Sequence, residues 1–209
     1  EHLSQDQPLS RHNPIIELTI PRLLHRLERV RPTVGTEVNT PDMAFSEHQP
    51  LVESLQQLQF RLADQGGLFN DGNQQSLSLL YLALDESGEL FNLLGRARAY
   101  GSLYLRTGHV PSDGVIILEQ IYDRLISQND LLQERVQRLV KESGTLRDVP
   151  PFNRNDWLQL DQVADYLDAS VIQAADLELP WRTYFDNISQ RVVLLAQARD
   201  QLLEQLATI

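Results

Sequence analysis

Apolar residues recur at spacings of three, four and seven along most of the chain, which is the period of an amphipathic α-helix. The longest such segment, over 73–107, contains no proline and predicts a helix roughly 50 Å long at about 1.5 Å per residue. It ends before Gly108, and Ser87-Gly88 is the expected point of bending. No segment alternates apolar and polar residues over the length of a strand. The pattern therefore predicts an all-α fold, an antiparallel bundle of about six helices with two or more long helices.

Two helices are expected before this segment, after an irregular lead-in. Asn13-Pro14 supplies a cap and a first-turn proline, and Pro21 should kink or restart the helix that follows. A loop over 33–45 then leads to a short helix, which Ser46 caps and Gly66-Gly67 ends.

Three helices are expected after the long segment. A short turn over 109–111 makes the next helix, which Ser112 or Asp113 caps, an antiparallel neighbour of the long one. Its apolar row is interrupted by a polar step at Gln128-Asn129.

After a break over 144–151, one helix begins at Asp156 and the last begins at Pro180. The last helix carries a coiled-coil-like seam, which Arg199 interrupts and which consists of Phe185, Ile188, Val192, Leu195, Leu202 and Leu206. The chain is thus predicted to be one helical domain over 1–209, made of a lead-in (1–12), N-terminal helices (13–66), a central hairpin (73–144) and C-terminal helices (155–209).

Composition narrows the functions that such a bundle can have. The formal net charge of −11, from 18 Lys and Arg against 29 Asp and Glu, argues against a nucleic-acid partner and against an anionic membrane surface. Any bound anion must therefore be held by a local basic pocket. The chain lacks cysteine, its five histidines are isolated, and it has no nucleophile or nucleotide-binding motif. We expect no enzyme activity, no cofactor and no metal site, and we assign the shared helix face of Asp161, Asp165 and Asp168 to solvated surface.

The candidate site lies between Gly95 and Ser102, where small residues crowd one stretch of helix. Gly95 and Gly101 each cost a helix roughly 1 kcal/mol relative to alanine, so close approach of another backbone or of a ligand should offset that cost. Arg98 continues the apolar stripe of Leu84, Phe91, Leu94, Gly101 and Leu105. A guanidinium on a buried face needs an acidic partner or a bound anion.

Two interpretations of Arg98 stay open on the sequence. In the first, Arg98 binds a carboxylate, nitrate or phosphate in a polar pocket between long helices. The other residues of that ligand-binding site are Arg96, Tyr100, Ser102, Gly95 and Gly101. In the second interpretation, Arg98 forms a buried bridge to a glutamate or aspartate of a neighbouring helix.

Two stretches resemble a known group of domains. The run S-L-S-L-L-Y-L-A-L-D-E-S-G-E-L-F-N-L-L-G-R-A-R-A-Y-G-S-L-Y-L-R-T-G over 76–108 contains the pattern L-G-x-x-R-x-x-G, matched by Leu94, Gly95, Arg98 and Gly101. It resembles the central helix of the helical extracytoplasmic sensor domains of bacterial transmembrane receptors. The ending that starts P-W-R-T-Y-F resembles the last helix of the same group, which is similar to nitrate-sensing and four-helix-bundle ligand-binding domains.

The resemblance implies a periplasmic ligand-sensing domain of an inner-membrane receptor, ahead of a chemoreceptor, histidine kinase or diguanylate cyclase output. It further implies homodimers, membrane spans before Glu1 and after Ile209, and signalling by displacement of long helices when a small, anionic molecule binds. Two alternatives remain. One is a helical scaffold whose last helix binds a partner protein without any small-molecule ligand, and the other is a sensor domain that recognises a periplasmic binding protein.

Overall fold

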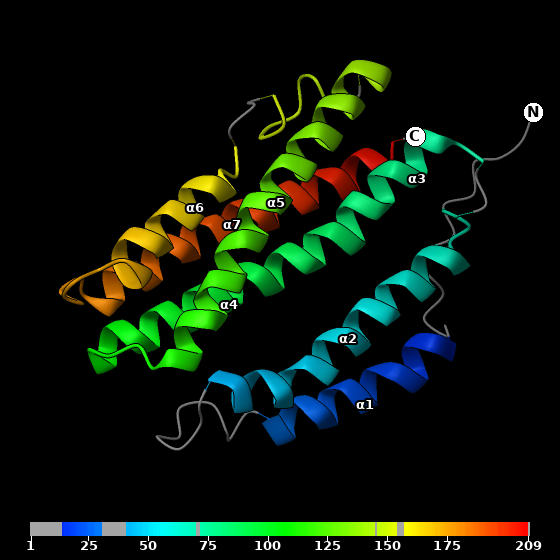
Figure 1. Cartoon of the computed structure of the whole chain (residues 1–209). Helices are drawn as coiled ribbons and strands as arrows, with labels where there is room; N and C mark the ends of the chain where they lie inside the picture. The colour runs from blue at the N-terminus through cyan, green and yellow to red at the C-terminus, as the bar shows by residue number, and fades with distance from the viewer. Residues whose placement is uncertain (1–13, 31–40, 70–71, 145, 154–156, 209) are drawn as a thin grey trace, which may run out of the picture. The chain divides into compact units, whose positions relative to one another are not determined.

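The computed structural model describes residues 14–30, 41–69, 72–144, 146–153 and 157–208 (Figure 1). Its described residues form helices joined by turns and bends, and none of them belongs to a strand, so the predicted all-α fold is confirmed. The chain divides into two compact units, Glu1–Asn70 and Asp71–Ile209, which we call the N-terminal and C-terminal units and describe separately. The prediction of a single domain stays a prediction.

The N-terminal unit is a pair of helices, α1 (Pro14–Val30) and α2 (Pro41–Gln65), which pack through Leu23, Leu51 and Leu58. Only Leu23 of the apolar stripe in α1 is buried, and its neighbour Leu24 is 54% exposed. The helix continues through Pro21 without the predicted restart, although a proline cannot donate the hydrogen bond of that turn.

The beginning of α2 corrects two predictions. The helix begins at Pro41, so the predicted loop is wrong over 41–45, and Ser46 lies inside the helix rather than at its cap. Proline fits the first position of a helix, where no N–H is needed and its φ is already helical. The resulting helix has 25 residues and is not short, whereas its end at Gln65, before Gly66-Gly67, is as predicted.

The long helix of the C-terminal unit is present, but it contains one irregular turn. It consists of α3 (Gln74–Tyr81), the π-helical segment η2 (Leu82–Glu86) and α4 (Ser87–Thr107). The side chain of Asn73 caps its start by accepting a hydrogen bond from Gln75 N at 3.0 Å, and Gly108 ends it with a φ of 68°. The irregularity thus directly precedes Ser87, where bending was predicted.

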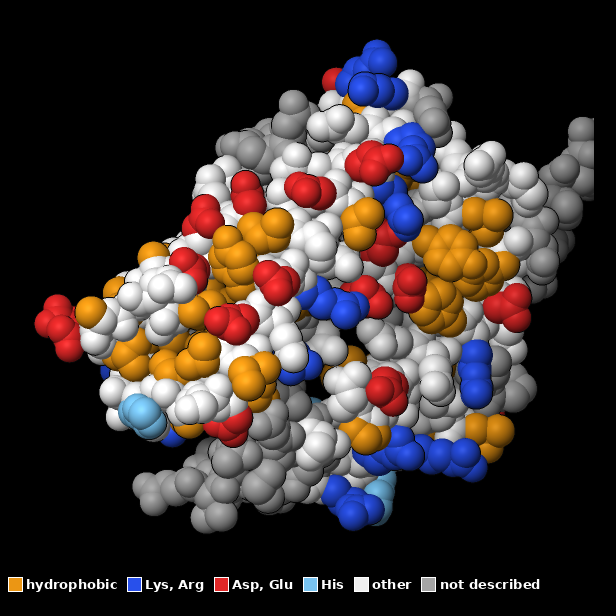
Figure 2. Space-filling view, in the orientation of Figure 1, with side chains coloured by type: hydrophobic (Ala, Val, Ile, Leu, Met, Phe, Trp, Pro, Cys, Tyr) orange, Lys and Arg blue, Asp and Glu red, His pale blue; other side chains and the backbone are white. Residues whose placement is uncertain are grey.

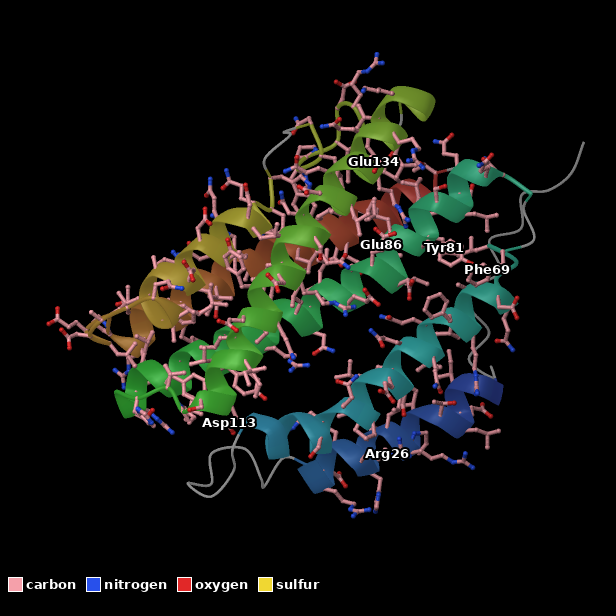
Figure 3. The ribbon with its side chains drawn as sticks, in the orientation of Figure 1. Arg26, Phe69, Tyr81, Glu86, Asp113 and Glu134 are labelled. Carbon is pink, nitrogen blue, oxygen red and sulfur yellow. The ribbon has the colours of Figure 1, made fainter. Side chains whose placement is uncertain are left out.

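Helix α5 (Ser112–Ser143) returns antiparallel to α4, as predicted (Figure 1). The predicted cap by Ser112 or Asp113 is wrong, because Pro111 occupies the cap position. The backbone of Pro111 is extended, and its carbonyl accepts the first helical hydrogen bond, from Val115 N. Glu86, labelled in Figure 3, pairs with Arg135 of α5 and so ties η2 to this helix.

The polar step in α5 has a structural purpose. Asn129 is buried, and its Oδ1 accepts a hydrogen bond from Leu160 N at 3.2 Å. Leu160 begins α6 (Leu160–Leu167), which continues as the π-helical segment η3 (Asp168–Ile172). The predicted start at Asp156 is therefore wrong: Trp157 to Gln159 precede the helix, whose first N–H is capped from a neighbouring helix rather than by a residue of its own.

We expect Asn129→Ala to lower the free energy of unfolding by about 1–3 kcal/mol, because the Leu160 N–H would be left buried without its acceptor. Urea unfolding monitored by circular dichroism measures this loss. Gln128→Ala, at the half-buried neighbouring position, is the control and should change stability by no more than about 0.5 kcal/mol. Equal losses in both variants would contradict the capping role of Asn129.

The last helix, α7 (Trp181–Leu206), packs mainly against α4 and also against α3 and η2. Four residues of its predicted seam are buried within the unit: Ile188, Leu195, Leu202 and Leu206. Val192 is half-buried, and Phe185 is 37% exposed. The chain's own helices therefore fill most of the seam. None of the helices in the described part of the chain is long and apolar enough to cross a membrane.

Candidate functional site

Tyr184 of α7 explains part of the small-residue stretch in α4. Its ring lies directly over Gly101, so that a Cβ added at Gly101 would overlap the ring. The Tyr184 hydroxyl donates a hydrogen bond to the carbonyl of Ala97 at 3.1 Å, and both residues are fully buried. The close approach predicted at Gly101 is therefore made by a side chain of α7 rather than by a ligand or another backbone.

The same tyrosine sits in an apolar environment with a second ring. Tyr166 of α6 stacks on it with a centroid distance of 5.4 Å and an interplanar angle of 11°. Burial raises the pKa of the Tyr184 phenol well above its usual range, and the neighbouring Tyr166 raises it further. The phenol is therefore a neutral donor that locks α7 onto α4, and it is not an acid or base at ordinary pH.

Arg98 lies at the α4–α7 interface, half-buried, and contacts two side chains one turn apart on α7. Its Nη1 donates a hydrogen bond to Ser189 Oγ at 3.2 Å, and its Cζ lies 4.7 Å from the centroid of the Phe185 ring. No carboxylate of the described residues forms an ion pair with it. The predicted bridge to a glutamate or aspartate is thus absent from the described part of the chain.

Two of the predicted residues flank Arg98 on the same face of α4. Ser102, one turn later, is buried, and its hydroxyl has no hydrogen-bond partner among the described residues. Gly95, one turn earlier, is bordered by open space, since a Cβ built there meets nothing within 4 Å beyond the adjoining residues and the backbone of its own helix. The helix period of 3.6 residues places these three positions in one row. Arg98 therefore has both room and an unsatisfied hydroxyl beside it.

Arg96 and Tyr100 are not brought to this row, because two residues correspond to about 200° around a helix. The Cζ of Arg96 lies 5.9 Å from the centroid of the Tyr100 ring, and the buried Nε of Arg96 has no hydrogen-bond partner within the described part of the chain. Tyr100 is fully buried and packs near Tyr104, with a centroid distance of 6.2 Å. The structure thus divides the six predicted residues between two faces of α4.

Sequence reasoning did not include Ser189 and Phe185 in the site, although both contact Arg98. Their spacing of four residues shows that both lie on one face of α7. The sequence does not show which residues of α4 that face contacts. Arg199 was noted only as a break in the seam. The Cζ of Arg199 lies 5.3 Å from the centroid of the Phe91 ring, and Arg199 lines a pocket of about 10 Å³, which is too small for anything larger than water.

Among the described residues, no group of three or more His, Asp or Glu side chains could hold a metal ion. Asp161 and Asp165 are exposed, and Asp168 is half-buried. The chemistry that the α4–α7 site offers is therefore that of one guanidinium, two hydroxyls and an aromatic face, which suits binding of a small polar or anionic group.

No protein-family model, no curated protein and no solved structure matches this chain.

Proposed function

We propose that the C-terminal unit is a ligand-sensing domain of the extracytoplasmic type found in bacterial membrane receptors, and that it binds a small anion at Arg98 between α4 and α7. The observation that carries this proposal is the state of Arg98. Its charge is half-buried at a helix interface, and among the described residues its contacts are the hydroxyl of Ser189 and the ring of Phe185. A guanidinium has five N–H donors, and most of those of Arg98 remain available to a ligand.

An oxyanion suits this arrangement for a chemical reason. Guanidinium groups bind carboxylate, nitrate and phosphate through two parallel N–H donors, and such charge-assisted hydrogen bonds are roughly twice as strong as neutral ones. The Ser102 hydroxyl can supply a further donor from the same face of α4. The open space beside Gly95 supplies room for the bound group.

Signalling would follow from a shift between two packings of α4 and α7. A ligand that binds Arg98 competes with Ser189 and Phe185, the two residues through which Arg98 holds α7. A hundredfold difference in affinity between the two packings shifts their equilibrium by about 2.7 kcal/mol. The Tyr184 ring over Gly101 opposes sliding, so we expect α7 to rotate about this contact.

A periplasmic location and homodimers belong to this proposal through the resemblance alone. Recognition of a periplasmic binding protein stays an alternative to binding of the free ligand. The competing hypothesis, a scaffold that binds a partner through the seam of α7, has less support, since Ile188, Leu195 and Leu202 of that seam are buried within the unit. Apolar segments of about 20 residues encoded on both sides of this chain would support the receptor, and their absence would favour the scaffold.

A thermal-shift screen with nitrate, dicarboxylates, amino acids and amines tests the site. At a ligand concentration a hundred times Kd, stabilisation is about 2.7 kcal/mol, which raises the midpoint of a unit of this size by roughly 5–10 °C. We expect Arg98→Ala and Arg98→Gln to abolish the shift. Arg106→Gln, on an exposed position of the same helix, should retain it.

Two results would contradict an anion site at Arg98. One is a screen in which no anion shifts the midpoint of the wild-type protein. The other is a shift that survives in Arg98→Gln. If Arg98→Ala alone fails to fold, the glutamine variant, which keeps most of the side chain's packing, decides between a ligand-binding and a structural role.

A further inference from the structure

A second basic site lies in the N-terminal unit, where α1 and α2 form a groove of about 550 Å³. That volume is within the range of small-molecule sites, roughly 300–1,000 Å³. The groove is lined by Thr19, Pro21, Arg22, Leu23, His25, Arg26, Arg29, Ser54, Gln57, Leu58 and Arg61. Four of these are arginines and none is acidic, in a chain whose formal net charge is −11.

The helix period brings these arginines together. Arg22, Arg26 and Arg29 follow one another at spacings of four and three along α1, and Arg61 of α2 lies across the groove from them. Like charges at such spacings destabilise a helix by about 0.2–0.5 kcal/mol per pair. The three arginines of α1 therefore lower the stability of this helix unless an anion offsets their repulsion. In Figure 2, basic side chains and a histidine gather over the helices of this unit.

Among the residues that the structure describes, one of the four arginines has a hydrogen-bond partner. Arg26, labelled in Figure 3, donates to Ser54 Oγ at 2.8 Å and to the carbonyl of Pro50 at 3.4 Å, and so joins α1 to α2. Arg22, Arg29 and Arg61 have no hydrogen bond or ion pair with any described residue. Their guanidinium groups are therefore available on both walls of the groove.

We infer that this groove binds a multiply charged anion that carries at least two phosphoryl groups. The seven residue steps from Arg22 to Arg29 span roughly 10 Å of helix, which is too far for a single phosphate to meet all the donors. Arginine forks bind phosphoryl oxygens in pairs, and the side-chain amide of Gln57 adds a neutral donor on the α2 wall. This site is separate from the one proposed at Arg98, and neither depends on the other.

Isothermal titration of the whole chain with sodium tripolyphosphate at constant ionic strength tests the inference. We expect Arg22→Gln/Arg61→Gln to weaken binding at least about tenfold, since two charged partners are lost. Arg106→Gln/Arg147→Gln removes the same charge from exposed positions outside the groove, and should keep Kd within about twofold. Orthophosphate should bind at least about tenfold more weakly than tripolyphosphate, because it reaches fewer of the arginines.

Three outcomes would overturn the inference: no binding of any phosphate anion, equal weakening in the two double variants, or equal affinity for orthophosphate and tripolyphosphate. A flotation assay with vesicles of phosphatidylglycerol, and of phosphatidylcholine as control, identifies the source of the phosphoryl groups. Competition between phosphatidylglycerol vesicles and tripolyphosphate would assign them to lipid headgroups. Binding of tripolyphosphate without such competition would assign them to a soluble ligand.

Discussion

Gly101→Ala is expected to lower the free energy of unfolding by about 2–4 kcal/mol, although alanine is the better helix former. The new Cβ would overlap the buried ring of Tyr184, which is rigid and sits between α4 and α6. Either the ring leaves its place or α7 moves away from α4, and both lose packing of a large buried side chain. This loss exceeds the roughly 1 kcal/mol that alanine contributes to helix stability.

Gly95→Ala in the same helix is the matched control and should have the opposite sign. A Cβ at Gly95 meets nothing within 4 Å beyond the adjoining residues and the backbone of its own helix, so the helix gains stability by about 0.5–1 kcal/mol without overlap. Urea unfolding of both variants measures the two effects. In a Tyr184→Ala background, Gly101→Ala should no longer destabilise, because the group that it overlaps is gone. Similar effects of the two glycine substitutions would show that the contact with Tyr184 is not tight.

Alkaline pH is expected to destabilise the wild-type protein more than Tyr184→Phe. Burial raises the pKa of the native Tyr184 phenol, whereas the phenol of the unfolded chain ionises near its ordinary value of 10.0. Above that pH the unfolded state binds fewer protons than the native state, so stability falls as pH rises. The loss is at most about 1.4 kcal/mol per pH unit, or up to about 2.7 kcal/mol between about pH 10 and 12.

Tyr184→Phe separates this effect from the titration of every other group. Below about pH 9 the variant should be less stable than the wild type by about 1 kcal/mol, because the hydrogen bond to the Ala97 carbonyl is lost. Near pH 11 the two curves of unfolding free energy against pH should cross. Parallel curves from pH 8 to 12 would mean that the native phenol titrates as freely as the unfolded one, and would contradict its burial.

Local sequence signals fixed most helix boundaries correctly where a cap or a terminating glycine acts within its own segment. Asn73 and Gly108 begin and end the long helix because their effects reach only the adjacent turn. The prediction of a loop is wrong at Pro41, since proline also fits the first turn of a helix. The predicted start of α6 is wrong as well, since the cap at Leu160 is supplied by Asn129 from another helix.

In the candidate site too, local features were predictable from the sequence and contacts between helices were not. The sequence identified Arg98, Gly101 and Ser102 as unusual, since charge and missing side chains on an apolar stripe are visible from spacing alone. It could not assign Tyr184 to the space over Gly101 or Ser189 to the Arg98 guanidinium, because these contacts depend on how α7 is registered against α4. The basic groove was missed for a related reason: Arg22, Arg26 and Arg29 are regularly spaced, but Arg61 joins them only when α2 packs on α1.

The amino-acid sequence by itself determined that this protein is helical, where most of its helices run, and which face of each is apolar, because these properties arise from interactions within one or two helical turns. The tertiary structure decided which helices contact each other. It thereby decided whether each polar side chain on those faces has a partner within the chain, and whether the space beside each glycine is filled by the chain or open to a ligand. Contacts between helices depend on packing among residues far apart in the chain, and the period of a single helix carries no record of that register.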